Sequence, residues 1–248
     1  MTETRAGVKL DVRVHPIENP KGDTRAFASV AINDLIAIRG VRVIEDKKGL
    51  FVAMPRSYDA KTGKHHDIAF PMTGTLRRDI TKAVLDENKQ QLALPAQERG
   101  YKKPEAAVDV DKEMESVKNM EIAENVKLDI RVFPIDDPQG STKAFASISV
   151  DGLISIRSAR VVEGDEGLFV AMPHTQDKYL NYHDVAFPLT RELRDVISEK
   201  VIDKFENPEK SLDRKQSLAD KLADGANKAS QHTAPQRVAA KSHAGALE

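Results

Sequence analysis

The heptapeptide GLFVAMP occupies Gly49–Pro55 and occurs again, letter for letter, at Gly167–Pro173. The match extends far beyond it. The segment LDVRVHPIENPKGDTRAFASVAI, which begins at Leu10, parallels LDIRVFPIDDPQGSTKAFASISV, which begins at Leu128. Such self-similarity within one chain is the mark of a duplicated structural unit. The sequence therefore predicts two copies of one small fold.

The second half of each copy fixes the extent of the repeats. HDIAFP from His66 matches HDVAFP from His183, and an amphipathic, helix-compatible segment closes each copy. The intervening segment begins with proline and glycine and continues as an acidic run, which is typical of a linker. Within it we predict either a short helix at about 109–122 or disorder. The predicted organisation is repeat 1 at 8–91, the linker at 92–125, repeat 2 at 126–208, and a short helix followed by a flexible tail at 209–248.

Composition excludes several classes of protein. The 248 residues are 40% hydrophobic and 31% charged, the balance of a globular protein. The chain contains no cysteine, which excludes disulfides, thiolate nucleophiles and thiolate metal ligands. No segment approaches the roughly 20 consecutive apolar residues of a membrane-spanning helix. The N-terminal residues also lack the apolar stretch of a secretory signal, so we expect a cytoplasmic protein.

Hydrophobic periodicity predicts the fold class. Leu10, Val12 and Val14 alternate with polar residues, which indicates a half-buried strand. A second alternating run follows, and Asn33 and Asp34 supply a tight reversal into a third. Each copy ends in an amphipathic helix whose apolar stripe in repeat 1 is Leu76, Ile80, Ala83 and Val84. We predict an α+β protein of two tandem repeats, each a small antiparallel sheet of four or five strands followed by a C-terminal helix.

The heptapeptide strand is too apolar on both faces for an exposed sheet edge. A repeat of about 80 residues buries limited apolar area, and pairing with a second copy is one way to gain more. We therefore predict that the two repeats pair within the chain, with higher oligomers as a further option. The predicted pairing residues are Leu50, Phe51, Val52, Leu168, Phe169 and Val170.

The order of motifs resembles a known family. AFASV, VRVI, GLFVAMP and HDIAFP, followed by a short helix, are similar to the stage V sporulation protein G family, the bacterial septation regulators called SpoVG. The resemblance covers both copies. It implies small cytoplasmic α+β proteins that dimerise through their sheets and bind DNA, and in some cases RNA, to modulate gene expression and cell division. The family is not known for enzymes.

The two copies differ in charge. Residues 8–91 hold 15 Lys and Arg against 11 Asp and Glu, a net charge of +4, whereas residues 126–208 hold 10 against 14, a net charge of −4. Opposite charges favour pairing of one repeat with the other. Only repeat 1 offers a basic surface, near the loop and helix where the resemblance implies nucleic-acid contacts. The candidate nucleic-acid-binding residues are Arg56, Lys64, Arg77, Arg78 and Lys82, with a solvated charged face as the alternative.

Two arginines of each third strand occur in both copies. Arg39 and Arg42 match Arg157 and Arg160. We interpret them as ion-pair partners on the sheet face rather than as phosphate ligands.

The sequence predicts neither a metal site nor a catalytic site. His65, His66 and Asp67 are adjacent on an extended chain and point to opposite sides, so we predict no metal site. Ser57, His66 and Asp67 lack the glycines of a nucleophile elbow. No phosphate-binding or dinucleotide fingerprint is present, so we predict neither an enzyme nor a cofactor. The rival to a nucleic-acid-binding regulator is a protein-interaction scaffold that has lost nucleic-acid binding.

Overall fold

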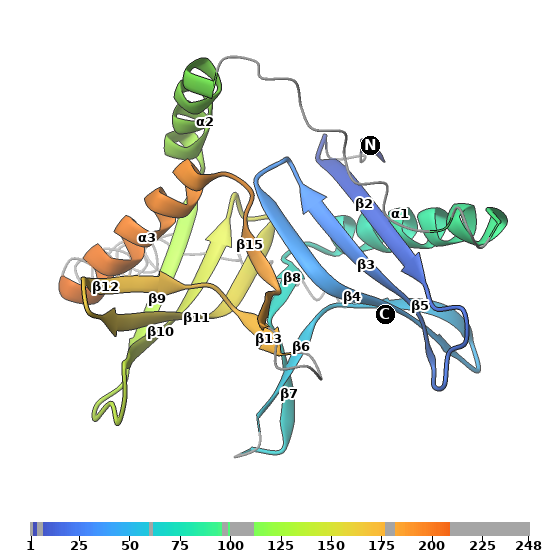
Figure 1. Ribbon diagram of the computed structural model, residues 1–248, viewed down its shortest axis with the longest axis horizontal. Coiled ribbons are helices and arrows are strands. Elements are labelled where there is room, and N and C mark those ends of the chain that lie inside the picture. Colours follow the sequence, from blue (N-terminus) through green and yellow to red (C-terminus); the bar gives the residue numbers. More distant parts are fainter. Residues whose placement is uncertain are drawn as a thin grey trace, which may run out of the picture. The chain divides into compact units, whose positions relative to one another are not determined.

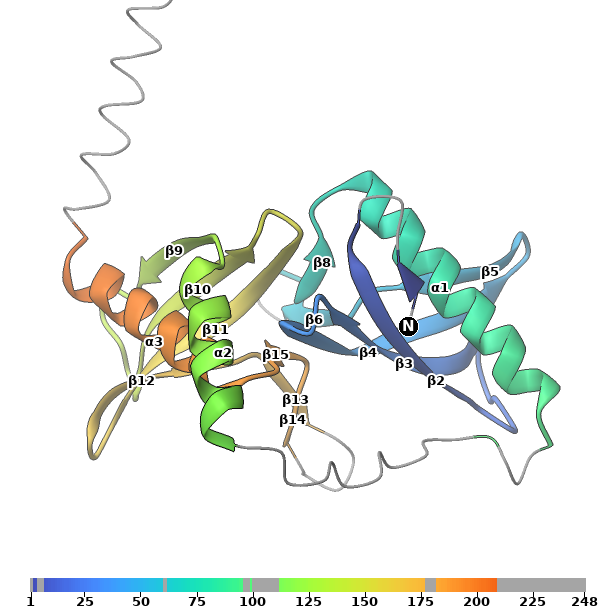
Figure 2. The same cartoon turned by 90° about the horizontal axis from the view of Figure 1, so that it is seen from above.

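The computed structural model describes residues 2–3, 7–59, 62–95, 99, 112–176 and 182–208. Figures 1 and 2 show its elements from two directions. The tail predicted at 209–248 and residues 96–98 and 100–111 of the predicted linker lie outside the described residues. The predicted fold class is confirmed, because each repeat is an antiparallel sheet followed by a helix.

Repeat 1 builds its sheet from consecutive antiparallel strands. The order is β1-β2-β3-β4, and β5 pairs with the C-terminal half of β4. Strands β6 and β7 form a separate hairpin. The elements are β1 (Thr2–Glu3), β2 (Lys9–Pro16), β3 (Thr24–Ile32), β4 (Ile36–Asp46), β5 (Gly49–Ala53), β6 (Arg56–Asp59), β7 (Lys64–Asp67), β8 (Ala69–Pro71) and α1 (Gly74–Ala93).

Repeat 2 follows the same plan after a helix in the linker. Its sheet runs β12-β11-β10-β9, and β13 and β14 form the second hairpin. The elements are α2 (Lys112–Asn125), β9 (Leu128–Pro134), β10 (Thr142–Val150), β11 (Ile154–Gly164), β12 (Gly167–Ala171), β13 (His174–Gln176), β14 (Tyr182–Asp184), β15 (Ala186–Pro188) and α3 (Arg191–Glu206).

Tight reversals join β3 to β4 and β10 to β11. Asn33 and Asp34 both have positive φ, 51° and 54°, as do Asp151 and Gly152 at 52° and 66°. Two consecutive positive φ values are what a type I′ hairpin turn requires, and its twist matches that of the flanking strands. The Asn33 side chain also accepts the backbone N–H of Lys9 at 2.9 Å. Residue types at this turn therefore fix the register of three strands.

A helix covers one face of each sheet (Figure 2). Helix α1 buries Leu76, Ile80, Ala83 and Val84, the stripe expected from the sequence. Helix α3 buries Leu193, Ile197 and Val201 in the same way. The inward residues of the strands complete the core, whereas the opposite face of each sheet carries polar and aromatic side chains. Among them are Phe27 at 48% exposure and Phe145 at 46%.

A threonine caps each of these helices. Thr73 Oγ1 accepts the backbone N–H of Leu76 at 3.2 Å, and Thr190 Oγ1 accepts that of Leu193 at the same distance. We expect Thr73→Ala to lower the free energy of unfolding by about 1 kcal/mol, because an N–H of the first turn loses its acceptor. Urea denaturation monitored by circular dichroism measures the change. Thr73→Ser is the matched control and should stay near wild type, so an equal loss in both variants would refute the capping role.

The two repeats exchange short strands. Strand β8 of repeat 1 pairs with β11 of repeat 2, with Ala69 opposite Ile156 and Pro71 opposite Ile154. Strand β15 of repeat 2 pairs with β4 of repeat 1 in the same register. Backbone hydrogen bonds extend both contacts, from Arg157 N–H to Ile68 O and from Arg39 N–H to Val185 O, each 2.7 Å long. Each sheet is thus completed by three residues from the other repeat.

The structure differs here from the predicted pairing through the heptapeptide. Strands β5 and β12, which hold Leu50–Val52 and Leu168–Val170, hydrogen-bond to β4 and β11 of their own repeats. Leu50 and Phe51 are 43% and 42% exposed, and Phe169 is 49% exposed. The reason lies in the length of β4 and β11. The C-terminal half of each strand pairs with the heptapeptide of its own repeat, and the N-terminal half pairs with the AFP segment of the other repeat.

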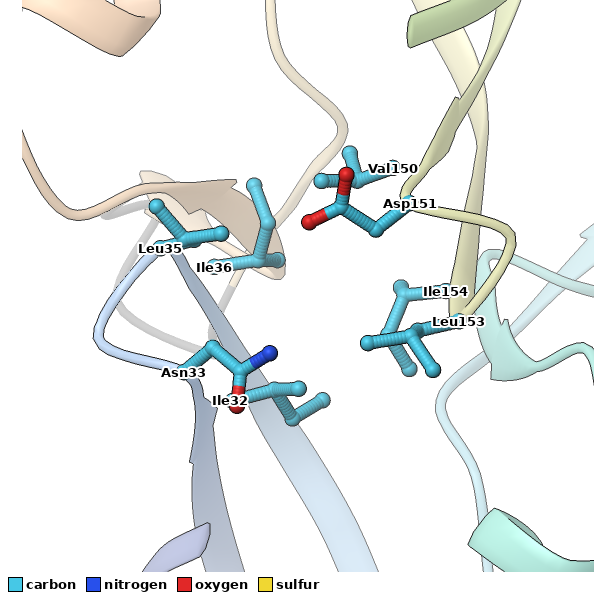
Figure 3. A pocket seen from close by; sticks show the side chains of 8 residues that line it. All are labelled: Ile32, Asn33, Leu35, Ile36, Val150, Asp151, Leu153 and Ile154. Carbon is cyan, nitrogen blue, oxygen red and sulfur yellow. The ribbon is translucent and has the colours of Figure 1, made fainter. Parts of the chain in front are cut away.

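Apolar side chains of the two tight reversals face one another across the repeats (Figure 3). Leu35 and Ile36 come from repeat 1, and Val150, Leu153 and Ile154 from repeat 2. The space between them is only about 10 Å³, too small for a ligand. Burial of these apolar side chains adds to the hydrogen bonds of the exchanged strands.

The linker contains one described helix. Helix α2 begins at Lys112 and ends at Asn125, three residues beyond the end predicted for the helix at 109–122. It packs against α3, and Ala123 and Val126 are buried in the common core. In the part of the chain that the structure describes, no helix is long and apolar enough to cross a membrane.

Candidate functional site

The five predicted cations lie on two different elements. Arg56 and Lys64 belong to the β6–β7 hairpin, whereas Arg77, Arg78 and Lys82 belong to α1. The hairpin projects below the sheet in the view of Figure 1, whereas α1 lies against one face of the sheet (Figure 2). The structure therefore gathers three of the five residues on one helix and separates the other two from them.

The hairpin holds an ion pair at its base. Arg56 Nε donates to Asp67 Oδ1 at 2.8 Å, on opposite strands of the ladder. Lys64 is exposed near the other end, and the Tyr58 and His65 rings contact each other with centroids 5.1 Å apart. An exposed ion pair contributes about 0–1 kcal/mol, so Arg56 could exchange its carboxylate for another anion at little cost.

Helix α1 presents its cations on the side away from the core. Arg77 and Arg78 are exposed, and Arg78 Nη2 donates to Thr75 Oγ1 at 3.4 Å. Lys82 forms an i,i+4 ion pair with Asp86 at 2.8 Å, with side chains 78% and 56% exposed. The helical period that buries Leu76 and Ile80 thus sets three positive charges within two turns of one solvent-facing surface, which we call the α1 basic face: Arg77, Arg78 and Lys82.

The corresponding surface of α3 has another charge pattern. Arg194 stands where repeat 1 has Arg77, and Asp195 where it has Arg78. Arg194 Nη2 lies 3.8 Å from Asp184, and Arg191 lies 3.7 Å from Asp195. The two helices therefore share a core and differ in the charge that they offer to solvent.

The predicted ion-pair role of the sheet arginines is replaced by stacking at two positions. The Arg39 guanidinium lies over the Phe187 ring, 4.7 Å from its centroid, and Arg157 lies over Phe70 at 4.6 Å. In each pair the arginine and the phenylalanine come from different repeats. Arg160 instead lies 3.3 Å from the ring nitrogen Nδ1 of His174. Cation–π contacts of this kind contribute about 0.5–1 kcal/mol at exposed sites.

The open face of the repeat 2 sheet contains a hollow of about 220 Å³. Its floor consists of three serines, and two arginines, an aspartate and two apolar side chains surround them. We call this the serine hollow: Phe70, Met72, Asp129, Arg131, Ser147, Ser149, Ser155 and Arg157. Phe70 and Met72 belong to repeat 1, so the hollow exists only because β8 pairs with β11.

The family model for SpoVG matches residues 8–90 and 120–207. The chain belongs to the SpoVG family. Three relatives are named SpoVG septation proteins. That of Heliobacterium modesticaldum is 40% identical over 83 residues, 34% of this chain and 91% of the relative. That of Archaeoglobus fulgidus is 40% identical over 70 residues, 28% and 82% respectively. That of Bdellovibrio bacteriovorus is 34% identical over 84 residues, 34% and 76% respectively.

Each of these SpoVG relatives aligns over about one repeat, so the two predicted copies of the family are confirmed. The second match begins at residue 120, inside α2, which is consistent with the burial of Ala123 against the repeat 2 core. The linker helix thus contributes its last turn to a SpoVG unit.

Sequence reasoning missed the serine hollow of the second SpoVG repeat. A signal was nevertheless present in the comparison of the copies. Ser149 and Ser155 stand where repeat 1 has Ala31 and Ala37, whereas the flanking apolar residues are kept. Ser149 on β10 and Ser155 on β11 lie opposite each other, and a polar replacement at both positions of a cross-strand pair indicates a sheet face that does not contribute to the core.

The histidines set aside in the sequence lie on the hairpin. His65 and His66 are exposed, and they pair with Tyr58 and Ser57 across the ladder. Among the described residues, no group of three or more His, Asp or Glu side chains could hold a metal ion.

Proposed function

We propose that this chain is a nucleic-acid-binding regulator of gene expression and septation, without catalytic activity, in which the two SpoVG repeats act as an intramolecular pseudo-dimer. The observation that carries the proposal is the α1 basic face, three exposed cations on a helix whose other face is buried. The septation names of the relatives support the cellular role.

The electrostatics favour phosphate as the ligand of this face. Arg77 and Arg78 are consecutive, exposed residues of α1, and arginine matches phosphate oxygens with a planar fork of donors. The Lys82–Asp86 pair is exposed on both sides, so its contribution is small and a phosphate could replace the carboxylate. Three such contacts release condensed counterions, which makes affinity depend steeply on salt.

The exchanged strands support the pseudo-dimer. A single repeat pairs Ile36–Ile38 of β4 with β3 on one edge only, and β15 supplies the partner for the other edge from the same chain. The +4 and −4 charges of the repeats also favour this pairing over pairing of like with like. In this arrangement repeat 1 presents the cations, and repeat 2 completes its sheet.

A salt titration tests the proposal. Fluorescence anisotropy would follow binding of labelled duplex DNA and single-stranded RNA at rising KCl concentration. We expect Arg77→Ala/Arg78→Ala to weaken binding about 10-fold or more and to reduce the slope of log K against log salt by about 2, because two phosphate contacts are lost.

The matched control removes two cations from the other helix. Arg191→Ala/Lys200→Ala acts on exposed residues of α3 and changes the net charge by the same amount. We expect its affinity to stay within about 2-fold of wild type, because salt screens the interaction between these distant charges and the bound nucleic acid. Equal losses in both double variants would mean that only net charge matters. Absence of binding by the wild-type chain would favour the interaction scaffold instead.

A further inference from the structure

We infer that the serine hollow binds one unpaired nucleotide of a single-stranded nucleic acid. The inference deepens the proposed function and rests on it, because it names a ligand class and a second contact surface. The hollow lies on the open face of the repeat 2 sheet, and it combines hydroxyl groups, guanidinium groups and an aromatic ring.

Cross-strand register places four of its residues in one row. Asp129 lies opposite Ser149, Ser149 opposite Ser155, and Ser155 opposite Phe70. Ser147 lies opposite Arg131 in the neighbouring row, on the same face. Hydroxyls both donate and accept, which is what the mixed donors and acceptors on the edge of a base require. A purely apolar ligand would not use these hydroxyls, and neither would a simple ion that carries a charge but no mixture of donors and acceptors.

The carboxylate argues against a bare phosphate. Asp129 lies 3.7 Å from Arg131 and faces the same hollow, so an anion bound between the arginines would meet a negative charge. A nucleoside instead offers donors to that carboxylate, such as exocyclic amines or the ribose 2′-hydroxyl. At about 220 Å³ the hollow is smaller than the pockets of about 300–1,000 Å³ that enclose larger ligands. It fits one base or sugar rather than a duplex.

Aromatic side chains continue the same face. Phe145 and Phe133 lie opposite each other on β10 and β9, 46% and 55% exposed. Because Phe145, Ser147 and Ser149 alternate along one strand, Phe145 lies about 14 Å from Ser149 on the same face. Exposed rings beside a polar hollow are the pattern by which proteins stack the bases of single strands.

The acidity of repeat 2 does not extend to this face. Strands β9 to β12 hold two acidic residues, Asp129 and Glu163, and four basic residues, Arg131, Lys143, Arg157 and Arg160. Helix α3, which packs against the opposite side of the sheet, holds five acidic and four basic residues, a net charge of −1, so most of the acidity of repeat 2 lies outside β9–β12 and α3. The sheet face is therefore locally positive.

Repeat 1 supplies a natural comparison. The equivalent row there is Asp11, Ala31, Ala37 and Phe187, in the same register. The two serine hydroxyls are missing, and the aspartate and the phenylalanine at the two ends of the row are the same. Ser149→Ala/Ser155→Ala in repeat 2 therefore reproduces a row that this fold already accommodates, and we expect its thermal stability to remain close to wild type.

The test uses the full-length chain and three labelled probes: a 12-nucleotide RNA, the single-stranded DNA of the same sequence, and the duplex. We expect Ser149→Ala/Ser155→Ala to weaken binding of the single strands about 10-fold, since two hydrogen bonds are lost, and to leave duplex binding unchanged. A larger loss for RNA than for DNA would place the ribose 2′-hydroxyl at these two serines, and equal losses would show that the serines contact only groups that RNA and DNA share.

Three further results separate this inference from the proposed function. Ala31→Ser/Ala37→Ser in repeat 1, which leaves the hollow intact, should not weaken single-strand binding. Unchanged single-strand affinity of Ser149→Ala/Ser155→Ala, with the Arg77→Ala/Arg78→Ala loss retained, would overturn the hollow as a site and leave the proposed function standing. Absence of any nucleic-acid binding by the wild-type chain would overturn both.

Discussion

Replacing Ala186 with aspartate is expected to lower the free energy of unfolding by about 3–5 kcal/mol. Ala186 lies in the exchanged strand β15, has no exposed surface and pairs with the fully buried Ile38. An aspartate there would bring an unpaired carboxylate into the apolar core. Urea denaturation gives the loss of stability. Hydrogen exchange at the Arg39 amide, which donates to Val185 O at 2.7 Å, reports whether the exchanged strand has opened.

Two further variants make this result specific. Ala69→Asp in β8 should cost a similar amount, because Ala69 is equally buried and pairs with Ile156 in the same register. Thr175→Asp adds the same charge at an exposed position of β13 and should change stability by less than about 0.5 kcal/mol. Near-wild-type stability of Ala186→Asp with slow exchange at Arg39 would show that β15 does not contribute to the sheet of repeat 1.

The strands and helices of each repeat could be predicted from the sequence because their signals are local. Leu10, Val12 and Val14 repeat every two residues, and Leu76 and Ile80 repeat with the helical period. Asn33 and Asp34 tolerate the positive φ that the reversal needs. These features depend on neighbours within a few residues, and the sequence states them directly.

The exchange could not be predicted because its information is not local. Strand β8 has only three residues, Ala69–Pro71, too few for a periodic signal. The heptapeptide has the stronger apolar pattern, so the sequence predicts the interface there and not at β8. The decisive feature is the length of β4, whose 11 residues exceed the five residues of β5 that pair with it. Register between distant strands becomes apparent only when the sheet is assembled.

The candidate site also has one part that could be predicted from the sequence and another that could not. The three cations of α1 share a face because helical geometry fixes where side chains point, and the sequence alone predicts this. Arg56 and Lys64 were assigned to the same surface because they are close in sequence, yet a hairpin carries them away from the helix. The serine hollow combines residues from β8 with residues from β9 to β11, so it depends on the exchange that the sequence did not predict.

The exchange leads to a prediction for the separated repeats. We expect a fragment of residues 7–95 to form a homodimer, whereas the full-length chain stays monomeric at the same concentration. In the fragment, Ile36–Ile38 of β4 has lost β15, and β8 has lost its neighbour β11. Two copies can supply both contacts to each other, because Ala69–Pro71 and Ala186–Pro188 have the same sequence, AFP. Light scattering after size-exclusion chromatography would give a mass twice that of the fragment.

Mixing the two fragments tests charge as the source of partner choice. A fragment of residues 120–208 should combine with residues 7–95 in preference to forming homodimers at low salt, because the repeats carry +4 and −4 over residues 8–91 and 126–208. Above about 0.5 M salt, where the Debye length falls below about 5 Å, the preference should approach the statistical mixture. Native mass spectrometry after equilibration at each salt concentration counts the species. A folded, monomeric 7–95 fragment would contradict the requirement for exchange, and a salt-independent preference would assign partner choice to packing of the AFP strands instead of charge.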